Sequence, residues 1–274
     1  MDEEDIKSMK LYNFIDRVYN ELKELGKEIE GDLSINELSS FDQLHYHGTE
    51  SIDFAIEKLG INSNSRVLEI GSGIGGPSRY IAKTTGAKVT ALELQEDHHL
   101  VGIDLTKRCG LENNVEHLCG DFLNMKLPDE KYDAVVSWLA LYHIPNRDDL
   151  LESCIKILKP NGYFFAEDFA FHNPFNNEEK SELSKDFFAN YIVSYDDYAS
   201  DLIKAGLKGI VSEDMTKSWS DFTKSRHKAY EDNIARHTRV HNEAVVENML
   251  YFYNFAMRYL DGGKLGGIRI YAKK

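Results

Sequence analysis

Residues 67–76 read Val-Leu-Glu-Ile-Gly-Ser-Gly-Ile-Gly-Gly, and this stretch decides the fold. Its apolar first half predicts a short buried strand over 66–70, and its second half predicts a glycine-rich turn that opens a helix over 78–85. Glycine suits such a turn because the backbone needs positive φ and because a side chain would block an approaching ligand. The stretch therefore predicts a ligand-binding loop between a strand and a helix.

A second predicted strand, 88–93, ends in the acidic residue Glu93, which lies 22 positions after Gly71. A carboxylate at that point can accept hydrogen bonds from the hydroxyls of a ribose. Gly71, Gly73 and Gly76 also fit the dinucleotide pattern, in which a pyrophosphate lies at the helix N-terminus. The glycines alone therefore leave more than one nucleoside-containing cofactor open.

Strands and helices alternate along most of the chain, which predicts an α/β fold with a parallel, doubly wound sheet. Because a final strand follows a long helical stretch over 220–260, we expect one core sheet with a helical cap and not two independent domains. The predicted strands are 66–70, 88–93, 114–119, 133–138, 163–171, 209–215 and 267–273. The expected single domain divides into N-terminal helices and lid (1–60), cofactor core (61–171), cap region (172–262) and final strand (263–274).

Three acidic or aromatic side chains discriminate between the cofactors. Glu69, directly before the glycines, would repel a pyrophosphate but suits a ligand that carries an ammonium and a sulfonium. Asp121 follows the third strand, where it can accept from an adenine amino group, and Phe122 can lie against the ring. The residue types therefore favour an adenosyl sulfonium ligand over a dinucleotide.

Residues 66–171 resemble the core of the class I S-adenosylmethionine-dependent methyltransferases in the glycine loop, the acids after strands two and three, and the turn Lys-Pro-Asn-Gly at 159–162. The resemblance implies a Rossmann-like sheet of seven strands and S-adenosylmethionine as cofactor. It also implies that Gly71 and Gly73 lie near the methionine part, Glu93 at the ribose, and Asp121 with Phe122 at the adenine. The full set expected at the cofactor is Gln43, Tyr46, Glu69, Gly71, Ser72, Gly73, Glu93, Leu94, Asp121, Phe122 and Trp138.

His143 follows the fourth predicted strand and is the candidate catalytic base. Its ordinary pKa is close to neutral pH, and ligands of α/β folds bind at the carboxyl ends of strands. The alternative is a histidine that only caps a helix or bonds to the backbone. Residues 41–48, which include Gln43 and Tyr46, form a second candidate segment that could fold over the cofactor, or else an ordinary polar loop.

A looser resemblance extends to the phosphoethanolamine and sarcosine/dimethylglycine N-methyltransferases. It rests on the loop at 41–48, His143, the pair Glu167-Asp168 in strand five and the late helical cap. It implies a small amine as acceptor. The chain departs from the phosphoethanolamine enzymes at Leu139, where those enzymes have an aspartate, and it offers no basic set for phosphate. Candidates for the tyrosine that pairs with the histidine in those enzymes are Tyr12 and Tyr19.

The cap region is rich in aromatic residues, which suit a cationic amine through cation–π attraction but suit an apolar acceptor equally well. Most of them would be core residues of amphipathic helices. Arg226 and Arg258 could bind an acceptor carboxylate. The alternatives are therefore an O- or C-methyltransferase for an aromatic, terpenoid or sterol-like acceptor, a non-catalytic cofactor-binding protein, or a nicotinamide oxidoreductase.

The composition of the chain narrows its possible binding partners and its cellular compartment. A formal net charge of −14 disfavours nucleic acid and anionic membrane surfaces. Three cysteines without close pairs predict neither disulfides nor a metal site. The acidic first residues and the lack of a long apolar run predict a cytoplasmic protein without a leader or membrane span. We expect a small-molecule acceptor, and the oligomeric state stays open.

Overall fold

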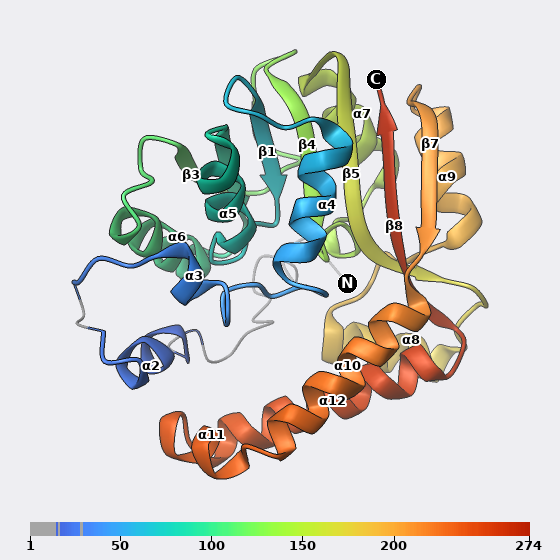
Figure 1. Cartoon of the computed structure of the whole chain (residues 1–274). Coiled ribbons are helices and arrows are strands. Elements are labelled where there is room, and N and C mark those ends of the chain that lie inside the picture. Colours follow the sequence, from blue (N-terminus) through green and yellow to red (C-terminus); the bar gives the residue numbers. More distant parts are fainter. Residues whose placement is uncertain (1–14, 16, 28–29) are drawn as a thin grey trace.

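The computed structural model describes residues 15, 17–27 and 30–274, which form a twisted sheet with helices on both faces and a helical cap below one edge (Figure 1). The strands are β1 (Arg66–Ile70), β2 (Lys88–Glu93), β3 (Val115–Cys119), β4 (Tyr132–Trp138), β5 (Leu158–Phe171), β6 (Val193–Ser194), β7 (Lys208–Asp214) and β8 (Leu265–Lys273). Their main path runs β3-β2-β1-β4-β5-β8-β7, and only β8 is antiparallel to its neighbours. The expected seven-stranded path is confirmed; an eighth strand, the two-residue β6, pairs with β5 beside it.

Alternate residues of each strand face opposite helix layers. Val67 packs with α4 (Thr49–Leu59) and α5 (Gly76–Thr85) on one face. Leu68 and Ile70 point to the other face, where α7 (Arg147–Ile157) and α9 (Tyr195–Lys204) cover the sheet. This is the period of two that a strand buried on both faces requires. Helix α6 (Glu96–Arg108) lies against β2 and β3.

The predicted turn at 159–162 is a bulge inside β5 and not a separate connection. Strand β5 begins at Leu158, which pairs with Tyr132, and the register then shifts so that Tyr163 pairs with Ala134. The Lys159 ammonium lies 2.8 Å from both carboxylate oxygens of Asp133, the unpaired residue of β4. The turn residues therefore allow one strand to loop outward and then resume its pairing.

The cap consists of α8 (Asn177–Phe187), α10 (Thr216–Glu231), α11 (Ile234–Val240) and α12 (Glu243–Asp261). These helices lie beyond the carboxyl ends of the parallel strands (Figure 1). The expected continuous helical region over 220–260 is thus three helices, because the chain turns at Asn233 and again at Asn242, whose side chain accepts from the Val245 amide. Helix α9 and strand β7 fall within the predicted cap region but belong to the sheet layer.

The N-terminal part contributes α2 (Arg17–Glu24) and α3 (Ile35–Leu38), followed by residues 41–48, here called the lid loop. Val18 and Leu22 of α2 are buried against Val101 and Leu105 of α6. Helix α2 is therefore anchored on α6. Tyr12, named above as a candidate partner of the histidine, lies outside the described residues.

Candidate active site

A cavity of about 1150 Å³ opens at the carboxyl ends of β1, β2 and β4. Its walls come from the glycine loop, the lid loop and the cap helices. All twelve residues that the sequence analysis named line it: Gln43, Tyr46, Glu69, Gly71, Ser72, Gly73, Glu93, Leu94, Asp121, Phe122, Trp138 and His143. The fold thus brings residues from a span of 101 positions into one site, although their individual roles stay predictions.

The glycine loop leaves no room for side chains at its first position. Gly71 has φ +72°, and a Cβ added there would collide with the side chain of Ala140. The amides of Gly71 and Ser72 both donate to the Leu92 carbonyl at 2.9 Å, which joins the loop to β2. The turn therefore needs glycine for its backbone conformation, as predicted, and also because Ala140 packs against this position; the predicted close approach of a ligand stays a prediction.

Glu93 is buried at the end of β2 and holds two backbone amides. Its Oε2 accepts from the Gly73 amide at 2.7 Å and its Oε1 from the Gln95 amide at 2.8 Å. Burial raises the pKa of this carboxyl group. Each carboxylate oxygen has two lone pairs, so both can accept a further bond from a hydroxyl in the cavity.

Glu69 is only 1% exposed and accepts a very short hydrogen bond from the Ser78 hydroxyl. Burial raises the pKa of Glu69 to about 8, against the opposing effects of Ser78 and Arg79. The carboxyl group is therefore largely protonated at neutral pH in the ligand-free protein. A cation bound beside it would shift it to the charged form.

Two of the polar atoms on the cavity wall that have no hydrogen-bond partner among the described residues belong to Ser72 of the glycine loop and Gln43 of the lid loop: the Ser72 hydroxyl and the Gln43 Oε1. Both side chains are buried, so each unpaired atom carries a desolvation cost unless a ligand satisfies it. A donor and an acceptor beside the glycine loop fit the amino-acid end of S-adenosylmethionine. These atoms, with the Gly71 cradle, show that the residues present suit that cofactor.

A buried ion pair that the sequence analysis missed holds the lid loop against the core. The Arg79 guanidinium of α5 lies 2.9 Å from the Asp42 carboxylate, with side chains 0% and 2% exposed. Arg79 also donates to the Ile74 carbonyl at 2.6 Å, so it links the lid to the glycine loop. In the sequence, Arg79 is one residue of an amphipathic helix pattern, and this pattern does not indicate a partner 37 residues away.

Replacing Arg79 with methionine is expected to lower the free energy of unfolding by about 3–5 kcal/mol, because Asp42 would remain buried without its partner. Equilibrium denaturation in urea measures this change. The matched control is Lys58→Met, which removes the exposed pair Lys58–Glu57 and should cost less than about 1 kcal/mol. Equal losses in the two variants would show that the buried pair does not secure the lid.

Asp121 and Phe122 lie in the turn after β3. The Asp121 carboxylate accepts from the Leu123 amide at 3.0 Å and from the Asn124 side-chain amide at 2.6 Å. The Phe122 ring is 5% exposed and lies on the same cavity wall. The two residues thus present an ordered carboxylate beside an aromatic face, as an adenine site requires.

His143 lies in a short 3-10 turn, Leu141–His143, directly after β4. Its Nδ1 is 3.0 Å from the Phe188 carbonyl, and burial lowers its pKa to about 4. Because a carbonyl only accepts, Nδ1 carries the proton and Nε2 is left as the acceptor. Nε2 has no partner among the described residues. The backbone bond offered as the alternative is therefore present, and it orients the neutral imidazole with Nε2 unpaired.

Aromatic stacking surrounds the lid side of the cavity. Tyr46 stacks on Trp219 with ring centroids 4.1 Å apart and an interplanar angle of 10°. Trp138 donates from its indole nitrogen to the Ser51 hydroxyl at 2.8 Å and contacts His45 with ring centroids 5.6 Å apart. Tyr46 and Trp138 thus shape the cavity largely through their rings.

The cap contributes a mainly aromatic wall at the acceptor end. The predicted cap aromatics that line the cavity are Phe187, Phe188, Phe222, Tyr230, Tyr251, Phe252, Tyr253 and Phe255. Arg226 also lines it, whereas Arg258 is paired with Glu182 at 2.7 Å. Tyr19 donates to Asp104 at 3.1 Å, and the tyrosine ring in contact with His143 is that of its neighbour Tyr142, with ring centroids 4.0 Å apart and an interplanar angle of 44°.

Sheet order, glycine loop and acids together define an S-adenosylmethionine-dependent methyltransferase fold. Residues 68–166 match the family described as methyltransferase domain. The chain is 26% identical over 205 residues to a phosphoethanolamine N-methyltransferase of Plasmodium falciparum, covering 72% of this chain and 73% of that protein. It is 32% identical over 125 residues, 46% of this chain, to a sterol 24-C-methyltransferase of Gibberella zeae.

Solved structures agree on the fold. A phosphoethanolamine N-methyltransferase 2 of Haemonchus contortus, in complex with phosphomonomethylethanolamine and S-adenosylhomocysteine, superposes with a TM-score of 0.84 at 16% identity. The match covers 100% of this chain and 61% of that one. The chain spans only 33% of the Gibberella zeae protein. In the part of the chain that the structure describes, no helix is long and apolar enough to cross a membrane.

Proposed function

We propose that this chain is an enzyme that transfers the methyl group of S-adenosylmethionine to the nitrogen of a small amine. The observation that carries the proposal is the cavity itself, in which a neutral imidazole faces the same space as the glycine loop and the buried acids. Methyl transfer needs alignment, exclusion of water and, for an ammonium acceptor, removal of a proton. The site offers all three.

In this proposal the cofactor is held by residues at three strand ends and by one residue of the lid loop. Ser72, Gln43 and Glu69 hold the amino-acid part, and Glu93 accepts from the ribose hydroxyls. Asp121 and Phe122 hold the adenine, while Gly71, Gly73 and Leu94 shape the cleft around them. The bound cofactor supplies a methyl group on a sulfonium, which is already activated for displacement.

His143 acts as the base of this proposal. Its Nδ1 proton is fixed on the Phe188 carbonyl, so Nε2 can take a proton from an ammonium or hydroxyl acceptor. Phe188 holds its carbonyl there through a left-handed backbone conformation, with φ +50°, at the end of α8. A methylated amine leaves as the product, and the proton stays on the imidazole until it passes to solvent.

The aromatic wall of the cap supports an amine, because ring faces attract cations. It also supports the second candidate, methylation of carbon or oxygen on an apolar acceptor, and one relative named above is a sterol methyltransferase. The net charge of −14 supports a small cationic or neutral acceptor and not nucleic acid. The three free cysteines of the described chain support a reducing, cytoplasmic location.

Cofactor binding is expected to release about one proton per chain near pH 7, because the ammonium of the ligand would convert protonated Glu69 to its charged form. Calorimetry of S-adenosylhomocysteine binding in buffers of different ionisation enthalpy measures this release. The Glu69→Gln variant should bind without it. Burial raises the pKa of Glu69 in the folded protein to about 8. Glu69 therefore has a proton to release below pH 8, and the proton release on binding should disappear well above pH 8. Equal release by the variant would contradict this role of Glu69.

A screen of methyl acceptors tests the proposed reaction. The full chain is incubated with S-adenosylmethionine and amino alcohols, amino acids, phenols or sterols, and formation of S-adenosylhomocysteine is followed. We expect turnover with an amine. Turnover only with sterols or phenols would favour the second candidate. Tight cofactor binding without turnover on any acceptor would indicate a binding protein and overturn the proposal of an enzyme.

A further inference from the structure

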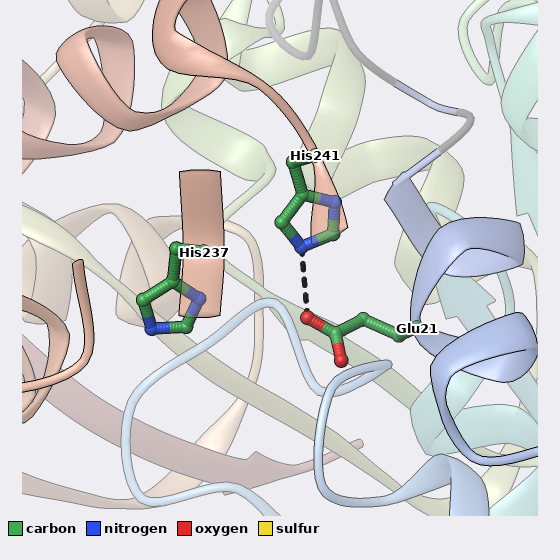
Figure 2. A group of neighbouring side chains, drawn as sticks. All are labelled: Glu21, His237 and His241. Atoms are coloured by element: carbon green, nitrogen blue, oxygen red, sulfur yellow. Dashed lines mark hydrogen bonds and ion pairs between the residues drawn. The ribbon is translucent and has the colours of Figure 1, made fainter. Parts of the chain in front are cut away.

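Three side chains with metal-binding atoms converge where the N-terminal helix meets the cap. They are Glu21 of α2, His237 of α11 and His241, the residue that caps the C-terminus of α11. One ligand atom of each lies within 4.8 Å of the others, and Nε2 of His241 is 2.8 Å from Oε1 of Glu21. Figure 2 shows both imidazoles facing the carboxylate. The group is distant in sequence from every residue assigned to the cofactor.

The spacing and ring orientation of the two histidines suit a shared ligand. Positions four apart on a helix lie on the same face. The His237 ring is stacked on Tyr230 at 3.9 Å with an interplanar angle of 6°, so its direction is fixed. Two imidazoles and one carboxylate are a common zinc donor set that leaves a position open for water.

One neighbouring charge competes with a metal ion. The Arg236 guanidinium donates to both Glu21 oxygens, at 3.1 and 2.6 Å, and must yield one of them. Its side chain is 34% exposed, and Glu24 is close enough to stabilise its charge. Arg17, the other cation near His237, instead donates to the Met249 sulfur at 2.9 Å. We therefore expect weaker binding than at a closed four-ligand site.

We propose that Glu21, His237 and His241 form a site for a divalent transition-metal ion, with Zn²⁺ as the best match, that clamps α2 onto the cap. All three residues also line the main cavity, where α2 and α11 are in contact. A bound ion would join α2 to α11 with bonds stronger than the present ion pairs. It would thereby restrain the opening of the cavity from that end.

Isothermal titration calorimetry of the full chain with Zn²⁺ tests the site. The informative variant is His237→Gln, because it leaves the bonds of Glu21 to Arg236 and His241 in place. We expect one ion per chain and at least about a tenfold loss of affinity in His237→Gln and in His241→Gln. The control is His172→Gln, which alters a histidine paired with Asp214 outside the cavity and should bind normally.

Two further measurements make the result independent of enzyme activity. Co²⁺ should give visible d–d bands of a low-symmetry site with the unaltered chain but not with His237→Gln. Amide hydrogen exchange of residues 17–24 should slow when Zn²⁺ is added, only in the unaltered chain and the control. Absence of binding, or binding that survives both histidine variants, would overturn the site whether or not the chain proves to be a methyltransferase.

Discussion

The variant His143→Ala is expected to lose turnover by about 10²–10⁴-fold with an amine acceptor, because Nε2 is the unpaired acceptor atom that would take the proton. Binding of S-adenosylhomocysteine should change by less than about threefold, since His143 is assigned to the acceptor and not to the cofactor. Steady-state kinetics and calorimetry on the same preparations separate the two effects. A variant with full turnover would show that no base is needed at this position.

The pH dependence of kcat/KM provides a second test of His143. Burial lowers its pKa to about 4, so the imidazole of the free enzyme is already neutral at pH 6. Any loss of activity caused by its protonation is therefore expected as pH falls towards 4, and not at the ordinary histidine value near 6.5. An acid limb centred near pH 6.5 that disappears in His143→Ala would contradict a buried, uncharged imidazole.

Replacing Glu93 with alanine is expected to weaken S-adenosylhomocysteine binding by at least about 100-fold. Two hydrogen bonds from ribose hydroxyls to a charged acceptor contribute about 1.5–3 kcal/mol each, which exceeds that factor. The affinity of Glu93→Gln should lie between those of Glu93→Ala and the unaltered chain, because glutamine keeps one oxygen acceptor. Calorimetric titration of the three proteins measures the series.

Glu96→Gln is the matched control for Glu93, because Glu96 is an exposed acid three residues further along, outside the cavity. It should bind the ligand within about twofold of the unaltered chain. Glu93 also orders the Gly73 and Gln95 amides, so thermal unfolding must show that Glu93→Ala is folded at the assay temperature. A folded Glu93→Ala that binds normally would remove Glu93 from the ribose site.

Much of the fold was predictable because its signals are local. The apolar run before Gly71 and the glycines after it specify a strand, a turn and a helix start within about ten residues. The alternation of such units then indicates a parallel, doubly wound sheet through the general rules of α/β folds, whereas the number of seven strands was implied by the family resemblance. Glu93, Asp121 and His143 could be named for the same reason: each lies at the end of a strand or within a few residues after it, and these strand ends meet at one edge of the sheet.

The parts that could not be predicted depend on pairs that only the tertiary fold brings together. Arg79 reads as an ordinary residue on a helix, yet it is fully buried against Asp42 of the lid loop. Glu21 meets His241 from 220 residues away. The wide bulge at 159–162 reads as a turn, since the residue types that favour a turn also favour an outward loop within a strand.

Calorimetric titration of the unaltered chain with S-adenosylhomocysteine, with reduced nicotinamide dinucleotide as the comparison ligand, is the most direct measurement on the cavity. We expect one saturable site per chain that S-adenosylmethionine competes for and the dinucleotide does not. A chain that shows no saturable binding of S-adenosylhomocysteine, or that prefers the dinucleotide, would show that the cleft between Glu69, Glu93 and Asp121 is not an adenosyl sulfonium site.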